Sequence, residues 1–241
     1  MPNITKTLGQ HMLVDARVLG KIIDAARISK NETVLEAGTG RGILTAELCK
    51  VARHVVSYEV DRKLYQQAQE RLQFQNLELA NADLFKTTGL RFDVFVSNLP
   101  YSRSRDAFEW LAVQKFNRAI VMVQEEFADK LAARPGSKNY RAISALAAHC
   151  FAIERLFSVG RQSFQPQPKV ESVVIRIVPA NTVTKETIKN LNLLFSKRNK
   201  KASTVAAKAR VKVDFGSKRV DQLAPGDLIR VAESISNVCS I

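Results

Sequence analysis

The chain has 241 residues, 46% of them hydrophobic, and is long and apolar enough to bury a sizeable core. Its 37 lysine and arginine residues outnumber its 23 acidic residues, and the resulting net charge of +14 favours a polyanionic partner such as nucleic acid. The sequence contains no apolar run of about 18 residues, no signal-peptide pattern, and three scattered cysteines, Cys49, Cys150 and Cys239. We therefore expect a cytoplasmic protein without a membrane span, disulfide framework or metal site.

An arm of residues 3–15 comes first, and Gly9 together with irregular apolar spacing argues against a helix there. Gln10 and His11 are polar residues set between apolar neighbours, so both are candidates for a site role. Asp15 then predicts the N-cap of an amphipathic helix. The apolar face of that helix consists of Val18, Leu19, Ile22, Ile23 and Ala26.

The next segment predicts a strand, a glycine loop and a helix in succession. Residues 33–37 form the strand, residues 38–42 contain three glycines, and the helix begins at Ile43. Glycines let the backbone approach a ligand closely, and a helix N-terminus offers unpaired N–H donors. A dinucleotide fingerprint needs glycine where Ile43 stands, and Glu36 would repel a pyrophosphate. The loop therefore favours a cationic cofactor over a nicotinamide or flavin dinucleotide.

Acidic residues follow the next two predicted strands. The strand over residues 54–58 ends before Glu59, which is placed to accept hydrogen bonds from ribose hydroxyls. Asp61 instead predicts the N-cap of the following helix. The strand over residues 77–80 precedes Asp83, which either joins Glu59 on one rim or forms a local Asx turn.

The stretch from Phe92 to Tyr101 predicts a buried strand with an abrupt end. Its β-branched and aromatic residues stop at the polar Asn98, and Pro100 restricts the backbone of Leu99 to an extended form. The residues from 98 to 101 should therefore stand on a stiff loop beyond the carboxyl end of the strand. Ligands of open α/β sheets bind at that edge.

The remaining pattern completes a doubly wound α/β sheet with a hairpin of the last two strands at its end. Phe164 follows the predicted strand over residues 151–159 and comes just before a loop that two prolines stiffen. Its ring either stacks on a base or fills the core. The predicted helices cover residues 106–113, 124–133 and 143–150, and the predicted strands cover residues 119–123, 151–159 and 170–178.

The composition changes after a linker at residues 179–183. Between Ser196 and Arg219 stand nine basic residues and one acid, flanked by predicted helices over residues 188–195 and 227–238. This pattern predicts a small helical domain with a cationic face, although a solvated run of charge is the alternative. We therefore divide the chain into a catalytic domain, residues 1–180, and a basic helical domain, residues 181–241.

Taken together, these motifs resemble those of the ribosomal RNA adenine dimethyltransferases, which modify paired adenosines near the 3′ end of small-subunit rRNA. The short C-terminal region is similar to that of archaeal members. The motifs that carry the resemblance are Leu8-Gly-Gln-His-Met-Leu13, Glu36-Ala-Gly-Thr-Gly-Arg-Gly-Ile-Leu-Thr45, Glu59-Val-Asp61, Asn81-Ala-Asp83, Asn98-Leu-Pro-Tyr101 and Phe164-Gln-Pro-Gln-Pro-Lys-Val-Glu-Ser172.

The resemblance implies a Rossmann-like methyltransferase sheet that uses S-adenosylmethionine as methyl donor. Glu59 would hold the ribose of this cofactor, and Asp83 would accept from its adenine amino group. The residues that the resemblance assigns to the cofactor are Gln10, His11, Leu13, Glu36, Gly38, Gly40, Glu59, Val60, Asp83, Leu84 and Asn98.

For the target, the resemblance implies that Asn98 and the Leu99 carbonyl accept from the exocyclic amine of an adenine. Tyr101 and Phe164 would stack on that base. Pro100 fixes its own φ and so stiffens the loop that presents Asn98 and Tyr101. The partner would be small-subunit rRNA within a pre-ribosomal small subunit, bound by a monomer. The basic residues expected to contact RNA are Arg103, Arg105, Lys197, Arg198, Lys200 and Lys201.

This chain departs from the family pattern at Met12, at Glu171 and, more strongly, at Arg103 and Arg105. The two arginines stand where related members have small or apolar residues, so they would alter the admission of the target or add phosphate contacts. Two other functions remain as alternatives. One is a non-catalytic ribosome-assembly or nucleic-acid-binding factor, and the other, disfavoured by Ile43, is a nicotinamide oxidoreductase.

Overall fold

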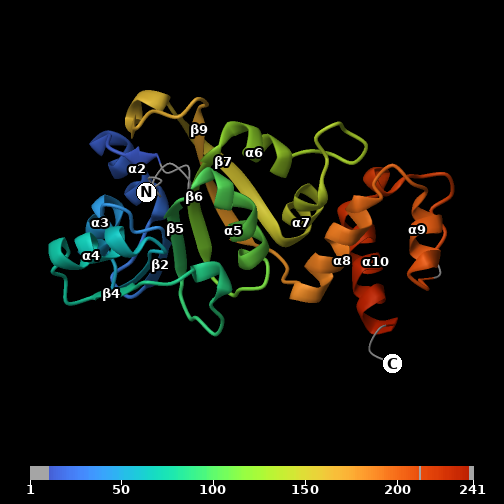
Figure 1. Ribbon diagram of the computed structural model, residues 1–241, viewed down its shortest axis with the longest axis horizontal. Coiled ribbons are helices and arrows are strands. Elements are labelled where there is room, and N and C mark those ends of the chain that lie inside the picture. The colour runs from blue at the N-terminus through green and yellow to red at the C-terminus, as the bar shows by residue number, and fades with distance from the viewer. Residues whose placement is uncertain (1–10, 212, 239–241) are drawn as a thin grey trace. The chain divides into compact units, whose positions relative to one another are not determined.

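The structure is a computed structural model that describes residues 11–211 and 213–238 (Figure 1). A seven-stranded sheet has the order β4-β3-β2-β5-β6-β9-β7. The chain passes outward from β2 to β3 and β4, returns to β5 on the other side of β2, and continues to β6. The pairs among these five strands are parallel, as a Rossmann-like fold requires. The strands of this sheet are β2 (Thr33–Ala37), β3 (His54–Tyr58), β4 (Leu77–Ala80), β5 (Val94–Asn98), β6 (Arg118–Gln124), β7 (Phe151–Val159) and β9 (Ser172–Pro179).

The two long strands β7 and β9 lie side by side at one end of the sheet, as predicted for the last two strands. β9 pairs antiparallel with β6. A separate small sheet joins β1 (Met12–Leu13) to β8 (Phe164–Gln165), with Leu13 opposite Phe164. This second pairing was not predicted, and it ties the N-terminal arm to the proline-rich loop.

Local chemistry explains where several helices begin. Asp15 accepts hydrogen bonds from the backbone N–H groups of Arg17 and Val18, and Asp61 does the same for Lys63 and Leu64, so both predicted N-caps are confirmed. The helices are α2 (Ala16–Ala26), α3 (Ile43–Val51), α4 (Arg62–Arg71), α5 (Ser104–Leu111), α6 (Glu125–Leu131), α7 (Ala142–Cys150), α8 (Lys185–Ser196), α9 (Ala202–Lys208) and α10 (Pro225–Val238), with short 3-10 turns η1 (Leu84–Lys86), η2 (Tyr101–Arg103), η3 (Arg161–Ser163) and η4 (Val220–Gln222).

The described chain forms two compact units. The first contains the residues up to Ala107 together with Lys115–Glu125 and Ile153–Val178, and it holds the sheet. Its core packs α2 and α3 on strands whose side chains are almost fully buried, among them Val34, Val94 and Val96. Burial of such apolar surface is the main force that holds these layers together.

The second unit contains Phe108–Gln114, Glu126–Ala152 and the described residues from Pro179 onward. Within it α10 packs on α7 and α8, and Tyr140 packs edge-on against Phe195. The predicted C-terminal region therefore shares this unit with residues that we had placed in the catalytic domain. The division into functional domains at residue 180 stays a prediction.

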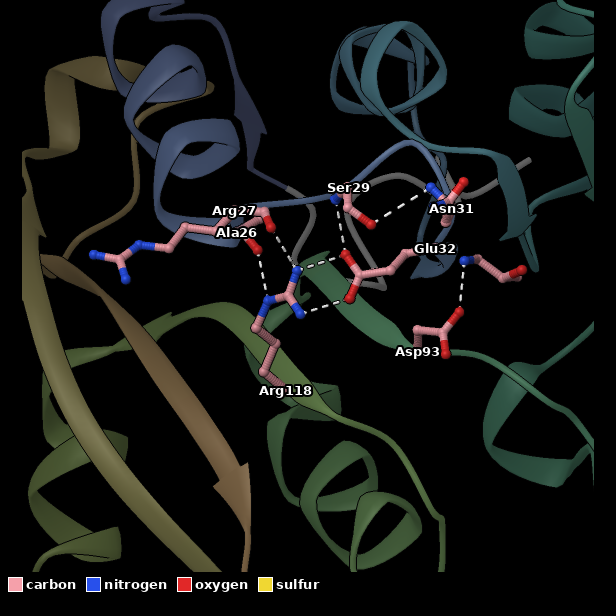
Figure 2. Close-up of polar contacts among 8 residues, drawn as sticks. Ala26, Arg27, Ser29, Asn31, Glu32, Asp93 and Arg118 are labelled. Carbon is pink, nitrogen blue, oxygen red and sulfur yellow. Dashed lines mark hydrogen bonds and ion pairs between the residues drawn. The ribbon is translucent and has the colours of Figure 1, made fainter.

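A polar cluster, the Arg118 cluster, closes the edge of the sheet where the parallel strands begin (Figure 2). Arg118 donates 2.8 Å hydrogen bonds to both carboxylate oxygens of Glu32, and its other N–H groups reach the carbonyls of Ala26 and Arg27 at 2.7 Å. Asp93 accepts from the backbone N–H of Thr33 at 2.8 Å. These contacts join the end of α2 to the starts of three strands, so we regard the cluster as structural.

Two observations bear on other classes of function. Among the described residues, no helix has the length and apolarity needed to cross a membrane. Across the same residues, no three His, Cys, Asp or Glu side chains gather closely enough to hold a metal ion. Cys49 and Cys150 are buried free thiols, whereas Cys239 lies outside the described residues.

Candidate functional site

The candidate site lies in the first unit, at the carboxyl ends of the parallel strands. β2 and β5 are neighbours there, and the chain order reverses between them. Such a reversal leaves a crevice, because the connections that follow the two strands depart in opposite directions. The glycine loop follows β2, and Leu99, Pro100 and Tyr101 follow β5, so both predicted motifs lie at this crevice.

The glycine loop is held by a carboxylate from the neighbouring strand. Gly38 and Gly40 have φ angles of 84° and 55°, values that only glycine adopts without strain. Glu59 accepts a 2.8 Å hydrogen bond from the Gly40 N–H through one oxygen and a 2.9 Å bond from the Asp61 N–H through the other. A side chain at Gly40 would place its Cβ 3.2 Å from the Met12 sulfur. The loop is therefore shaped for close approach of backbone to a ligand.

A pocket of about 720 Å³, the loop pocket, opens between the glycine loop and the residues after β5. Nine of the residues that we predicted for the site line it: His11, Leu13, Gly38, Gly40, Glu59, Asn98, Leu99, Pro100 and Tyr101.

A second pocket of about 510 Å³, the Asp83 pocket, adjoins the first. The two share Gly38, Glu59, Leu99 and Pro100 as lining residues, so they form neighbouring parts of one groove. Asp83 and the shared Glu59 are the acidic groups of an otherwise largely apolar slot. The other residues that this pocket adds are Ala37, Tyr58, Val60, Ala82, Leu84, Phe85 and Arg103.

Glu36 lines neither pocket and lies behind the glycine loop. One of its oxygens accepts 2.6 Å hydrogen bonds from the hydroxyls of Thr45 and Ser57, and the other has no partner. Complete burial raises the pKa of this carboxyl to about 7, and the negative charge of Glu59 adds to the effect. Burial also raises the pKa of Glu59. Both carboxyls therefore lie where neutralisation by a proton or by a cationic ligand is favourable.

The residues after β5 are braced by the N-terminal arm and by β9. Asn98 donates through its amide nitrogen to the His11 carbonyl at 3.4 Å, an arrangement that leaves its oxygen as an acceptor. The rings of His11 and Tyr101 lie 5.4 Å apart, and the Tyr101 hydroxyl is 2.8 Å from that of Ser172. His11 in turn contacts the Pro166 carbonyl at 2.8 Å. The polar groups at this wall therefore have defined positions.

Phe164, a predicted site residue, lines neither pocket of the groove. Phe164 is only 3% exposed and belongs to the hydrophobic core with Leu13 and Leu19, so the core interpretation describes its place in this structure. Gln10 lies outside the described residues. The stacking role of Phe164 and the cofactor role of Gln10 stay predictions.

The basic residues predicted to contact RNA occur in both units. Lys197, Lys200 and Lys201 are exposed in the second unit, where Arg198 forms an ion pair with the buried Asp221 at 3.8 Å. In the first unit Arg105 is exposed on α5. Arg103 instead lies against Asp83, with its Nη2 atom 2.9 Å and 3.1 Å from the two carboxylate oxygens.

Sequence reasoning missed the hydroxyl groups that support the site. Thr45 and Ser57 hold Glu36, and Thr39 contacts Ser57 at 2.6 Å. Ser57 is buried near the end of β3. A hydroxyl within an apolar strand needs a hydrogen-bond partner, so its presence in the sequence could have indicated a polar contact there. The contact of Ser172 with Tyr101 has no local signal, since the two residues are far apart in sequence.

The groove suits a ligand with a purine, a ribose-sized centre and a positive charge. The Asp83 pocket offers an apolar slot with a carboxylate acceptor for an exocyclic amino group, and the loop pocket offers the buried acid Glu59. The amide of Asn98 and the aromatic ring of Tyr101 at the same wall suit a second planar ligand with hydrogen-bond donors. The arrangement is therefore compatible with transfer of a group between two nucleoside-like molecules.

A comparison with protein families matches residues 1–235 to the family described as "Ribosomal RNA adenine dimethylase". Ribosomal RNA small subunit methyltransferase A of Thermotoga maritima is 35% identical over 201 residues, 82% of this chain and 72% of the relative. Probable ribosomal RNA small subunit methyltransferase A of Methanosarcina mazei is 32% identical over 254 residues, 97% of this chain and 94% of the relative. The likeness therefore extends through both compact units.

A solved structure is similar over the same length. The crystal structure of a dimethyladenosine transferase from Plasmodium falciparum aligns with 94% of this chain and 98% of that chain, with a TM-score of 0.76 and 27% sequence identity. The sequence and the backbone therefore agree on one set of relatives.

Proposed function

The chain belongs to the ribosomal RNA adenine dimethylase family, and from this premise we propose that it dimethylates N6 of adenosines in small-subunit rRNA with S-adenosylmethionine as donor. One observation supports the assignment to this groove more than any other. Asn98, Leu99 and Pro100 form a wall of the loop pocket, and Leu99 and Pro100 also line the Asp83 pocket. A donor and an acceptor can therefore meet at the end of β5.

The residues present fit S-adenosylmethionine. Asp83 would accept from the adenine amino group, Val60 and Leu84 would flank the ring, and Glu59 would accept from the ribose while it holds the glycine loop. The positive charge of the donor suits a site that is lined by the buried carboxyl of Glu59 and has the buried Glu36 behind its glycine loop. The bound cofactor supplies an electrophilic methyl group on a sulfonium.

The acceptor side needs positioning more than proton abstraction. The lone pair of an adenine amino group is delocalised into its ring, so it is a poor nucleophile. The Asn98 amide oxygen and the Leu99 carbonyl would accept the two N–H bonds and direct the lone pair toward the donor. Tyr101 would stack on the extruded base, and a contact of this kind contributes roughly 1–3 kcal/mol per base.

The finer parts of the proposal concern the context of the reaction. The targets would be adjacent adenosines near the 3′ end of the rRNA, reached within a pre-ribosomal small subunit during ribosome biogenesis. The protein would act as a monomer in the cytoplasm. The exposed Lys197, Lys200 and Lys201 would contribute phosphate contacts, which makes binding sensitive to salt.

The direct test incubates the full chain with small ribosomal subunits that carry unmodified adenosines and with isotopically labelled donor. We expect label in N6,N6-dimethyladenosine after the rRNA is digested and its nucleosides are resolved by mass spectrometry. Folded protein that binds the donor but transfers no label to rRNA adenosines would contradict the proposal. That outcome would instead favour a non-catalytic assembly factor on the same fold.

A further inference from the structure

Arg103 is held by two carboxylates and an aromatic ring at the outer side of the Asp83 pocket. Its Nη2 atom contacts both oxygens of Asp83, at 2.9 Å and 3.1 Å, and its Nε atom lies 3.0 Å from Asp106 in an ion pair. Its guanidinium carbon stands 5.1 Å from the centre of the Phe85 ring, within the range of a cation–π contact. The side chain is 28% exposed. Two of the three guanidinium nitrogens thus face carboxylates of the protein, Nη2 through hydrogen bonds and Nε through the ion pair alone, which reduces the value of Arg103 as a phosphate ligand.

From this arrangement we propose that Arg103 is a positioning residue for cofactor recognition, which orients Asp83 so that the pocket selects an adenine amino group. The inference rests on the proposed function, since it concerns the donor that the groove would bind. It gives Arg103 a role on the cofactor side of the site instead of the RNA contact predicted from its charge.

The hydrogen bonds at Asp83 explain why an arginine is needed. One carboxylate oxygen accepts a hydrogen bond from the Phe85 N–H at 3.1 Å. This single contact does not by itself stop the carboxylate from rotating. A single Arg103 nitrogen bridges both oxygens and sets the plane of the group. A carboxylate has about four acceptor positions, so these three contacts leave capacity for one more donor.

The carboxylate that Arg103 orients also determines which ligand atom is accepted. The Asp83 carboxylate accepts hydrogen bonds but donates none, and Arg103 holds its two oxygens in place. An amino group at position 6 of a purine can therefore bind to it, whereas a carbonyl oxygen at the same position meets a negative oxygen. Asp106 is 51% exposed and serves as the outer support of the arginine.

The test compares the full chain with Arg103→Ala, using two probes in titration calorimetry. The probes are S-adenosylhomocysteine and S-inosylhomocysteine, which differ at position 6 of the purine. We expect the wild type to bind the adenosyl compound more tightly than the inosyl compound. In the variant the ratio of the two affinities should fall by on the order of tenfold, which corresponds to one hydrogen bond of about 1.4 kcal/mol.

Matched variants separate positioning from charge and from folding. Arg103→Lys should recover part of the preference, because one ammonium can still contact Asp83 but has no second nitrogen to pair with Asp106 at the same time. Lys86→Ala removes a cation 4.0 Å from the same carboxylate, and it should leave the preference unchanged since that lysine is 84% exposed. Thermal unfolding of each variant verifies that it is folded.

Each result decides the inference. An unchanged ratio of the two affinities in folded Arg103→Ala would overturn it, and tighter binding of the adenosyl probe by that variant would show that the arginine obstructs the pocket. A wild type that binds neither probe would overturn the proposed function together with this inference. Wild-type binding with an unchanged ratio in the variant would overturn the inference alone.

Discussion

Carboxylates at the two ends of the parallel strands have opposite surroundings and opposite pKa shifts. At the start of β2, Glu32 is paired with Arg118, whose guanidinium lowers the pKa of that carboxyl to about 2. Near the end of the same strand, Glu36 has only hydroxyl donors, and burial raises its pKa to about 7. A paired carboxylate, Glu32, therefore stands at one end of β2, and a buried carboxyl without a cationic partner among the described residues, Glu36, stands near the other.

This contrast in charge pairing distinguishes the end of the sheet that supports the fold, at the Arg118 cluster, from the end that would bind ligands, at the groove. The Arg118 cluster pairs its charges internally, so no ligand is needed to offset their desolvation. The buried acid Glu59 lines the groove and the buried Glu36 lies behind it, and a cationic donor bound in the groove would reduce the cost of burying Glu59. Substitutions at the two ends should consequently affect different measurements.

The largest effect is expected from Asn98→Ala at the groove. Removal of the amide oxygen takes away an acceptor that acts on the target amine, and loss of such a positioned group lowers kcat by about 10² to 10³-fold. Asn117 is an exposed residue just before β6, where its side chain hydrogen-bonds to Glu32 at the opposite end of the sheet, so Asn117→Ala is the matched control and should keep full activity. Methyl transfer to unmodified small subunits measures both variants, and an active Asn98→Ala protein would disprove the acceptor assignment.

Arg118→Met should have the next largest effect, and it should appear in stability. The substitution removes the arginine donors from the Glu32 carboxylate and from the Ala26 and Arg27 carbonyls, while Glu32 keeps the Ser29 N–H. Because the paired side chains are 19% and 16% exposed, we expect a loss of about 2–3 kcal/mol, at or below the lower end for a fully buried pair. Urea unfolding at neutral pH measures the loss. Arg91→Met, at an exposed arginine, should change stability by less than about 0.5 kcal/mol. Equal effects of the two substitutions would refute the structural role of Arg118.

Glu32→Gln should alter the acid limb of the stability curve. Because the pKa of Glu32 is about 2 in the folded chain and 4.5 as a free side chain, its contribution is complete above pH 4.5 and is lost as the pH falls toward 2. We expect the variant to be about 2 kcal/mol less stable than the wild type at pH 6 and nearly equal near pH 2. A difference that stays constant across this range would contradict the ion pair.

Glu36→Gln should give the opposite and smallest change. The folded pKa of about 7 exceeds the free value of 4.5, so ionisation of Glu36 reduces wild-type stability as the pH rises from 4.5 to 7. The glutamine variant should lack this fall and gain about 1 kcal/mol on the wild type between pH 5 and pH 8, less than the full shift because its amide must replace the carboxyl contacts. Parallel pH profiles of the two proteins would exclude Glu36 as the group that titrates.

Local patterns predicted much of the sheet. The bounds of β2, β3, β4 and β7 agree with those expected from sequence, because apolar runs and polar stops occur within a few residues of each other. The caps Asp15 and Asp61 were equally visible, since a side chain reaches backbone donors only two or three residues away. The glycine loop and the residues after β5 were identified for the same reason.

The sequence by itself therefore determined the α/β architecture, the family and the motifs at the carboxyl ends of the strands. Tertiary structure decided how side chains distant along the chain share hydrogen bonds and burial. It paired Arg103 with Asp83 across 20 residues and Arg118 with Glu32 across 86. It also buried Phe164 in the core. Those outcomes depend on which strand ends meet in space, and no local pattern of residues contains that information.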